Sequence, residues 1–196
     1  KTITKNNGTL TVNKRNVTLT SQSATKQYDG TELTAPEVKV TGDGFVDSEV
    51  SDIKATGTIT KVGSVTNTIT YTKNDSFKAD NYDITKDEGT LTITKNEKEI
   101  VVTAKNATKT YDGKALTEEG YEVAGLPEGY TPVVETSGSI TDAGSTENKI
   151  TSVKIMKGKE DVTDQFKTIT KVDGKLTVNK RNVTLTSQSA TKQYDG

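Results

Sequence analysis

The sequence predicts an all-β protein made of two tandem modules, each a small Ig-like β-sandwich, joined end to end in an elongated array. Apolar residues alternate with polar ones, often Thr, as in Leu10 and Val12 or Val17 and Leu19. Such alternation is typical of half-buried antiparallel strands. Gly or Asn-Asp punctuation recurs at short intervals, as in small sandwiches and barrels. No window has the apolar spacing of an amphipathic helix.

The third observation is a repeat. The segment 10–30 recurs without change as 176–196, and a diverged copy ends at Gly113. Every copy ends in Tyr-Asp-Gly, with Tyr at positions 28, 111 and 194, so the spacings are 111 − 28 = 83 and 194 − 111 = 83. Such regularity indicates a tandem-repeat protein.

The parity of the alternation predicts the module boundaries. Leu10 and Val12 lie at even positions and Val17 and Leu19 at odd ones, so one straight strand would point the two pairs to opposite faces. The same reversal recurs near 96–99 and 179–182. We therefore expect four parts: a closing strand of a preceding repeat at 1–13, repeat module 1 at 14–96, repeat module 2 at 97–180, and an opening strand of a following repeat at 181–196.

Two further elements are expected inside each module. Residues 57–69 match 138–150 at a constant offset of 138 − 57 = 81, which predicts two strands flanking a Gly-containing turn. Residues 81–93 and 165–178 each predict a hairpin with Gly at its tip, with aromatic and aliphatic side chains facing the core. A β-grasp-like module is the alternative fold. It needs a helix, and only the segment 157–165 is ambiguous enough to supply one.

Composition excludes several classes of function. The chain has a formal net charge of −1 and contains neither Cys nor His, which removes disulfides, thiolates and most general-base and metal sites. We expect no catalytic residues, no metal site and no cofactor, because a carboxylate-based glycosidase would need two acids held in a shaped cleft. Arg occurs only at Arg15 and Arg181, so nucleic acid is not an expected partner. No apolar run is long enough for membrane insertion.

Two acidic stretches invite a Ca²⁺ interpretation. Residues 42–52 place several carboxylates on a Gly-containing loop, and Glu160, Asp161 and Asp164 form a second cluster. Hard cations bind carboxylates in flexible loops, but neither stretch has the ligand spacing of a Ca²⁺ loop. We expect solvated loops. An internal Lys–Asn crosslink is a further alternative, for which the sequence assigns no triad.

The closing segments carry a family resemblance. The Tyr-Asp-Gly triplets, the Gly-rich middle, and the stretches NYDITKDEGTLTITK and DVTDQFKTITKVDGKLTVNK resemble the MBG/YDG-type (mucus-binding-type) repeats of bacterial cell-surface adhesins. The resemblance spans both modules. It implies an extracellular protein of the bacterial cell surface, anchored in the cell wall through a region outside this segment. Gln165-Phe166 replaces the Asn-Tyr pair of the first module, which keeps the aromatic ring and loses the hydroxyl.

The resemblance implies a non-catalytic stalk that projects a binding region from the cell, with neighbouring repeats of the same chain as partners. The alternative is that the repeats themselves bind mucin glycans or a host protein. In the triplets, Asp is expected to stabilise a turn, Gly to supply a positive φ, and Tyr to pack its ring. This structural turn motif comprises Tyr28, Asp29, Gly30, Tyr111, Asp112, Gly113, Tyr194, Asp195 and Gly196.

Overall fold

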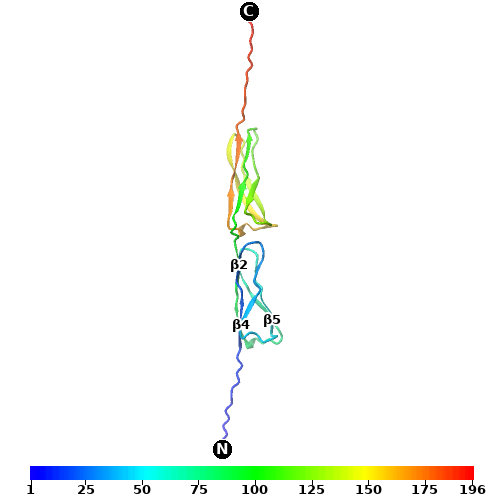
Figure 1. The fold of residues 1–196 in the computed structure, drawn as a ribbon, viewed down its shortest axis with the longest axis vertical. Helices are drawn as coiled ribbons and strands as arrows, with labels where there is room; N and C mark the ends of the chain where they lie inside the picture. Colours follow the sequence, from blue (N-terminus) through cyan, green and yellow to red (C-terminus); the bar gives the residue numbers. More distant parts are fainter. The chain divides into compact units, whose positions relative to one another are not determined.

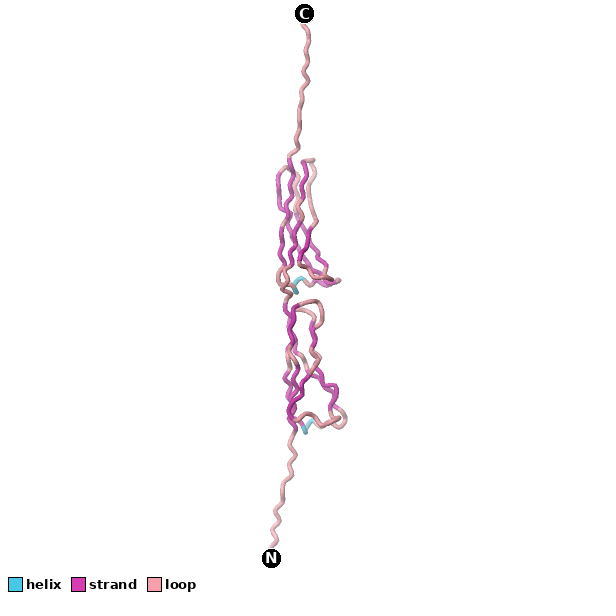
Figure 2. Tube along the Cα trace, in the orientation of Figure 1, coloured by secondary structure: helices cyan, strands magenta, loops and turns pink.

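A computed structural model describes all residues, 1–196, and divides into two compact units, Lys1–Glu97 and Lys98–Gly196 (Figure 1). Nearly all regular structure is β, which confirms the predicted all-β class. The only helical elements are two 3₁₀ turns, η1 (Ala79–Asn81) and η2 (Thr163–Gln165), coloured cyan in Figure 2.

The β-grasp alternative is wrong, because that fold needs an α-helix packed on its sheet and the chain forms none. The ambiguous segment 157–165 contains the end of one strand, the two-residue strand β16 (Glu160–Asp161) and the turn η2.

The first unit contains ten strands: β1 (Arg15–Ser21), β2 (Ala24–Gln27), β3 (Leu33–Thr34), β4 (Val38–Gly42), β5 (Val50–Ala55), β6 (Thr58–Ile59), β7 (Gly63–Thr66), β8 (Ile69–Lys73), β9 (Tyr82–Asp87) and β10 (Thr90–Thr94). They form two three-stranded sheets, in the orders β4-β1-β9 and β2-β10-β7, and two strand pairs, β3-β6 and β5-β8. The predicted strands around the turn at 60–62 are β6 and β7, which pair with β3 and β10 and not with each other.

Two long segments of the first unit run side by side in the same direction. We call residues 15–27 (β1 and β2) the N-terminal arm and residues 82–94 (β9 and β10) the C-terminal arm. β1 pairs in parallel with β9 from Arg15↔Tyr82, and β2 pairs in parallel with β10 up to Gln27↔Thr94. The offset is constant along both ladders, since 82 − 15 = 67 and 94 − 27 = 67. The arms therefore leave one sheet and enter the next together.

This arrangement corrects the predicted hairpin at 81–93. β9 and β10 are not partners but successive parts of one arm in different sheets. Gly89, expected at a hairpin tip, lies where the arms approach each other: a Cβ at this position would lie 2.5 Å from the carbonyl carbon and oxygen of Gln22. Glycine is needed for close backbone approach and not for a turn. The predicted burial is nevertheless right, because Tyr82, Leu91 and Ile93 are buried.

The main core of the first unit joins the two arms to the middle strands. Val17 and Leu19 from β1, Ile69 from β8 and Tyr82 from β9 form its buried centre. Partly buried side chains surround this centre: Val38, Phe45, Ile53, Tyr71, Phe77 and Ile84. Phe77 stacks on Tyr82 with ring centroids 5.3 Å apart. This burial of apolar and aromatic surface is the main term that stabilises the unit.

The second unit repeats the plan with eight strands: β11 (Ile100–Ala104), β12 (Ala107–Thr110), β13 (Tyr121–Ala124), β14 (Thr131–Ser137), β15 (Gly144–Lys157), β16, β17 (Ile169–Val172) and β18 (Gly174–Asn179). Its sheets have the orders β13-β11-β17 and β12-β18-β15-β14, with β16 on β15. Its arms, 100–110 and 169–179, also pair in parallel at a constant offset, since 169 − 100 = 69 and 179 − 110 = 69. The hairpin predicted at 165–178 is wrong for the same reason: β17 and β18 lie in different sheets.

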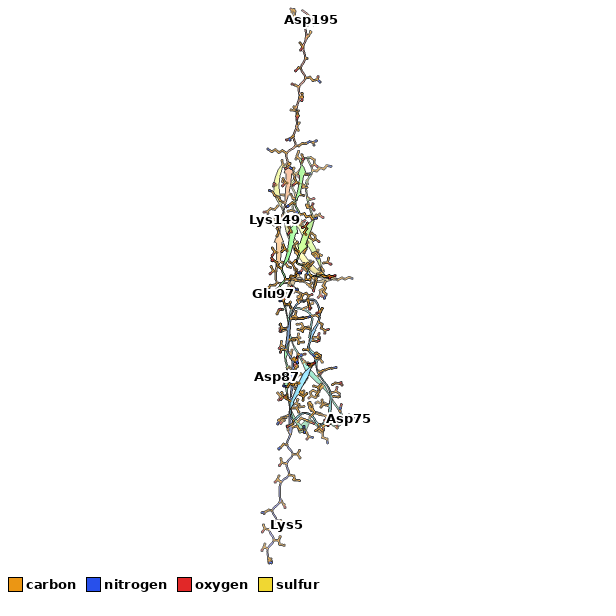
Figure 3. All side chains as sticks on the ribbon, viewed as in Figure 1. Lys5, Asp75, Asp87, Glu97, Lys149 and Asp195 are labelled. Atoms are coloured by element: carbon orange, nitrogen blue, oxygen red, sulfur yellow. The ribbon has the colours of Figure 1, made fainter.

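Residues 1–14 and 180–196 contain no strand, although their alternation predicts one. Leu10 is 101% exposed, whereas Leu176, in the same sequence context, is 0% exposed within β18. β18 lies between β12 and β15, and residues 9–13 have no such neighbours in this chain. Figure 3 shows Lys5 and Asp195 on these segments with no strand beside them. Tertiary pairing, and not intrinsic propensity, decides the conformation of this sequence.

Candidate functional site

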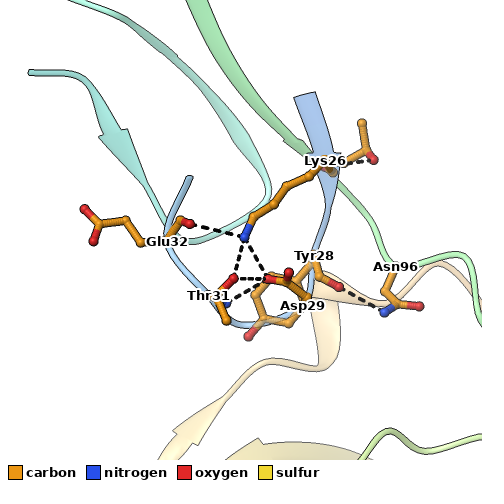
Figure 4. Close-up of polar contacts among 7 residues, drawn as sticks. Lys26, Tyr28, Asp29, Thr31, Glu32 and Asn96 are labelled. Carbon is orange, nitrogen blue, oxygen red and sulfur yellow. Dashed lines mark hydrogen bonds and ion pairs between the residues drawn. The ribbon is translucent and has the colours of Figure 1, made fainter. Parts of the chain in front are cut away.

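The Tyr-Asp-Gly triplet of the first unit forms a turn stabilised by a lysine that sequence analysis missed (Figure 4). Lys26 extends from β2, and its Nζ donates to Asp29 Oδ1 at 2.9 Å and to Thr31 Oγ1 at 2.5 Å. Asp29 Oδ1 also accepts from the Thr31 backbone N–H at 2.8 Å, an Asx turn. Gly30 has φ 75°, the left-handed conformation that favours glycine.

The same bonds recur in the second unit. Lys109 Nζ donates to Asp112 Oδ1 at 2.6 Å, and the Lys114 N–H donates to the same oxygen at 3.0 Å. The third copy lies outside any strand, yet Lys192 and Asp195 still form an ion pair at 2.6 Å. The signal was readable in the sequence, because Lys stands two residues before Tyr in all three copies. The five-residue pattern Lys-x-Tyr-Asp-Gly therefore encodes this turn locally.

These contacts lower the pKa of two carboxyl groups. The hydrogen bond from Lys26, followed by those from Thr31, holds the pKa of Asp29 well below its usual range. The hydrogen bond from Lys109 lowers the pKa of Asp112 in the same way. A lowered folded-state pKa means that the stabilisation is complete above the unfolded pKa of about 3.9 and is lost as the pH falls through the folded value. Both carboxylates are thus ionised acceptors committed to their own turn.

The tyrosines of the triplets share one backbone contact but differ in exposure. Tyr28 N–H donates to Thr94 O and Tyr111 N–H to Asn179 O, each at 2.8 Å, so each triplet is tied to the last strand of its own unit. Tyr28 is 3% exposed, whereas Tyr111 is 40% exposed. Tyr111 lines an open depression of the second unit together with Asp142, Ala143, Lys180, Arg181 and Val183.

Acidic side chains and backbone groups of the loop 42–52 in the first unit form hydrogen bonds with other residues of the same unit. Asp43 Oδ2 accepts from the Asn16 N–H at 2.9 Å, and the Arg15 Nε donates to Gly44 O at 2.9 Å. The Tyr82 hydroxyl donates to Glu49 Oε2 at 2.5 Å and accepts from the Val46 N–H. Burial, followed by the Glu49 carboxylate, raises the pKa of Tyr82. These acids hold the loop closed over the aromatic core.

The second acidic cluster is likewise engaged locally. Asp161 Oδ1 accepts from the N–H and the hydroxyl of Thr163, and Asp164 Oδ1 accepts from Gln165 Nε2. The Thr163 contacts lower the pKa of Asp161. No three Asp or Glu side chains lie together in a way that could hold a metal ion. No helix of the chain is long and apolar enough to cross a membrane.

A buried asparagine in each unit is the polar feature that sequence reasoning did not single out. Asn67 is fully buried, and its Nδ2 donates to Gln22 O at 3.0 Å and to Ala35 O at 2.8 Å. Its Oδ1 accepts from the Gly57 N–H at 3.1 Å. Gln22 lies where the N-terminal arm changes sheets, so Asn67 fastens that point of the arm to the middle of the unit.

Asn148 occupies the equivalent place in the second unit. Its Nδ2 donates to Lys105 O at 3.0 Å and to Glu118 O at 2.9 Å, but its buried Oδ1 has no hydrogen-bond partner. A Gly stands ten residues before the Asn in both modules, since 67 − 57 = 10 and 148 − 138 = 10. A Cβ on either Gly would lie about as close as a hydrogen bond to the Asn Oδ1, at 2.8 and 3.1 Å. This Gly-Asn pair was the available sequence signal.

Comparisons with models of known protein families, with curated proteins and with solved structures find no match for this chain.

Proposed function

We propose that this chain is a non-catalytic stalk segment of a bacterial surface adhesin, made of tandem Ig-like β-sandwich modules and located outside the cell. The geometry of the Tyr-Asp-Gly turn carries the proposal: the Asp carboxylate of the triplet is bound by the lysine two residues before Tyr and by the backbone of the turn. Lys26 and Asp29 satisfy each other and the turn backbone, and Lys109 and Asp112 repeat this arrangement. A recognition tip would present such groups to a partner, whereas a structural corner uses them internally.

The sandwich assignment rests on how the core is shared. The core of the first unit combines Val17 and Tyr82, from the sheet β4-β1-β9, with Ile53 and Tyr71, from the separate pair β5-β8. Apolar side chains from two separate sheets meeting in one core are what a sandwich requires. Both units also share the same pair of parallel arms, which supports repetition of one module.

Two measurements on the full chain test the proposal. Small-angle X-ray scattering would give the maximum dimension of the two-unit chain, and a stalk requires that value to be close to the summed lengths of the units. A compact pair of units would refute the stalk. Binding to immobilised mucin and to a glycan array tests the alternative function, for which the stalk proposal predicts no saturable signal.

The Tyr111→Ala variant sharpens the binding test, because Tyr111 is the exposed tyrosine of a folded unit. Asn16→Ala serves as a matched surface control in the first unit, where residue 16 is exposed. Saturable binding of the parent chain that Tyr111→Ala abolishes and Asn16→Ala preserves would replace the stalk by a binding module.

A further inference from the structure

The two parallel arms of each unit determine how tension would act on it. In the first unit the chain enters at Arg15, at one end of the paired arms, and leaves at Thr94, at the other end. Because the arms run in the same direction, pulling these two points apart slides one arm along the other. The ladder hydrogen bonds of a parallel pair are evenly spaced and run from one strand to the other at a slant, so all of them share the load at once.

Side-chain bonds between the arms continue across the gap where both change sheets. Ser21 Oγ accepts from the Gly89 N–H and Ser23 Oγ accepts from the Thr90 N–H, each at 2.9 Å. In the second unit Asn106, equivalent to Ser23 by the spacing of 83 (106 − 23 = 83), accepts from the Lys175 N–H at 2.7 Å. The connection between the arms is therefore continuous in both units.

Both ends of the paired arms are also fastened. At the entry end Lys14 pairs with Asp83 across the arms at 3.2 Å. At the exit end the Tyr28 N–H donates to Thr94 O, and Asn96 Nδ2 donates to Tyr28 O at 2.9 Å. The Lys14 pair is exposed and adds little stability, whereas the two bonds to Tyr28 extend the ladder beyond its last residue pair.

Buried side chains oppose sliding as well. Val17 and Leu19 of the N-terminal arm and Leu91 and Ile93 of the C-terminal arm are each at most 1% exposed. Sliding by one residue would turn each of these side chains to the opposite face of its strand. Movement of one arm along the other therefore has to break the ladder and expose the core in the same step.

We infer that each unit is a shear-loaded mechanical module, in which the paired arms bear tension along the chain and the middle strands brace them. This inference deepens the proposed stalk function and rests on it. Forced unfolding reports the unfolding barrier and not the equilibrium stability, so pulling experiments address it directly and without any ligand.

The chain contains no cysteine, so handles can be placed at chosen positions. In the full chain carrying Lys14→Cys and Lys95→Cys, force applied between the two cysteines acts along the arms of the first unit. In the variant carrying Lys14→Cys and Asp80→Cys, force acts between the starts of the two arms, which lie next to each other. It therefore opens the β1-β9 ladder one residue pair at a time. All three positions are exposed, and both double variants lose the Lys14–Asp83 ion pair equally. The expected result is a several-fold higher rupture force along the arms, and equal or reversed forces would overturn the inference.

A second variant tests load sharing between the arms. Ser23→Ala removes the bond to the Thr90 N–H, and Ser51→Ala is the matched control, since Ser51 bonds Asn74 outside the arms. Ser23→Ala should lower the rupture force of the 14–95 pull and leave the 14–80 pull unchanged, while Ser51→Ala should affect neither. An unchanged 14–95 force, or an equal loss in both directions, would contradict load sharing. Mucin binding by the chain would overturn the stalk function while leaving these forces unaltered.

Discussion

The buried Asn67 gives the sharpest stability prediction. Substitution by Ala leaves three backbone groups without their partner, the carbonyls of Gln22 and Ala35 and the N–H of Gly57. Each unsatisfied buried group costs about 1–3 kcal/mol, so three such groups cost about 3–9 kcal/mol in total. Because the three bonds are only part-buried, we take the lower half of this range and expect Asn67→Ala to lower the free energy of unfolding by about 3–6 kcal/mol. A typical domain is stable by only about 5–15 kcal/mol, so the first unit should be severely weakened.

Asn148→Ala is the matched comparison in the second unit. The Asn148 side chain makes two of these bonds, and its Oδ1 has no partner, so the expected loss is smaller, about 2–4 kcal/mol by the same arithmetic. Asn16→Ala, at an exposed position, should cost less than about 0.5 kcal/mol.

Urea unfolding of the full chain, followed by far-UV circular dichroism, measures these losses. Hydrogen exchange by mass spectrometry assigns them to a unit, since local stability differs along a chain. If Asn67→Ala lowers the free energy of unfolding no more than Asn16→Ala does, Asn67 does not fasten the N-terminal arm to the middle of the unit as proposed.

The Asn67→Asp variant adds a pH signature. Its carboxyl would be buried and would face the carbonyl oxygens of Gln22 and Ala35, which disfavours the charged form and raises the folded pKa above the unfolded value of about 3.9. A raised folded pKa means that stability is retained below the unfolded pKa and is lost as the pH rises through the folded pKa. The variant should therefore be closer to the parent in stability at about pH 3 than at about pH 7.

Three further predictions follow from close contacts. Gly89→Ala would place a Cβ 2.5 Å from the backbone of the opposite arm. Overpacking of this kind lowers the free energy of unfolding by about 1–3 kcal/mol or more, which thermal unfolding would detect. Gly8→Ala is the neutral control, because a Cβ there would have nothing within 4 Å. Lys26→Met should raise the carboxyl pKa of Asp29 toward about 3.9 in an NMR titration, and an unmoved midpoint would exclude Lys26 as the main cause. Tyr82→Phe removes a hydroxyl with two partners and should cost about 1–3 kcal/mol in urea unfolding; in the parent chain, ultraviolet titration should show one tyrosine ionising above the ordinary value.

The alternation in the sequence predicted the strands and much of the core, because period two reports which face of a strand is buried. Val17, Leu19, Leu91 and Ile93 are buried as this pattern requires. Alternation does not say which strand is the partner, and parallel pairing of the arms joins residues 67 positions apart. Gly89 was misread for this reason: the same residue type serves a turn and a close backbone approach, and only the partner distinguishes them.

The turn of the candidate site was predicted from the sequence, whereas the side chains that support it were missed although the sequence carries a signal for each. Asp29 and Gly30 behave as turn chemistry predicts, whereas Lys26 was missed because it lies on a strand and not in the turn. Asn67 was missed because its residue type alone does not distinguish it from the many surface asparagines of this chain, and only the Gly-Asn spacing that both modules share marks its position. Only its burial, which depends on residues far away in sequence, makes it a brace.

The constant pairing of the arms also bears on how such a chain could change length between generations. The repeated segments 10–30 and 176–196 are identical. The first includes the whole N-terminal arm of the first unit, and the second includes the end of the C-terminal arm of the second unit. A genetic crossover between them would delete or duplicate whole modules in frame. Because the two segments are identical, each C-terminal arm in the recombinant chain would still pair with an N-terminal arm of unchanged sequence. The number of modules could therefore change without any new packing contact.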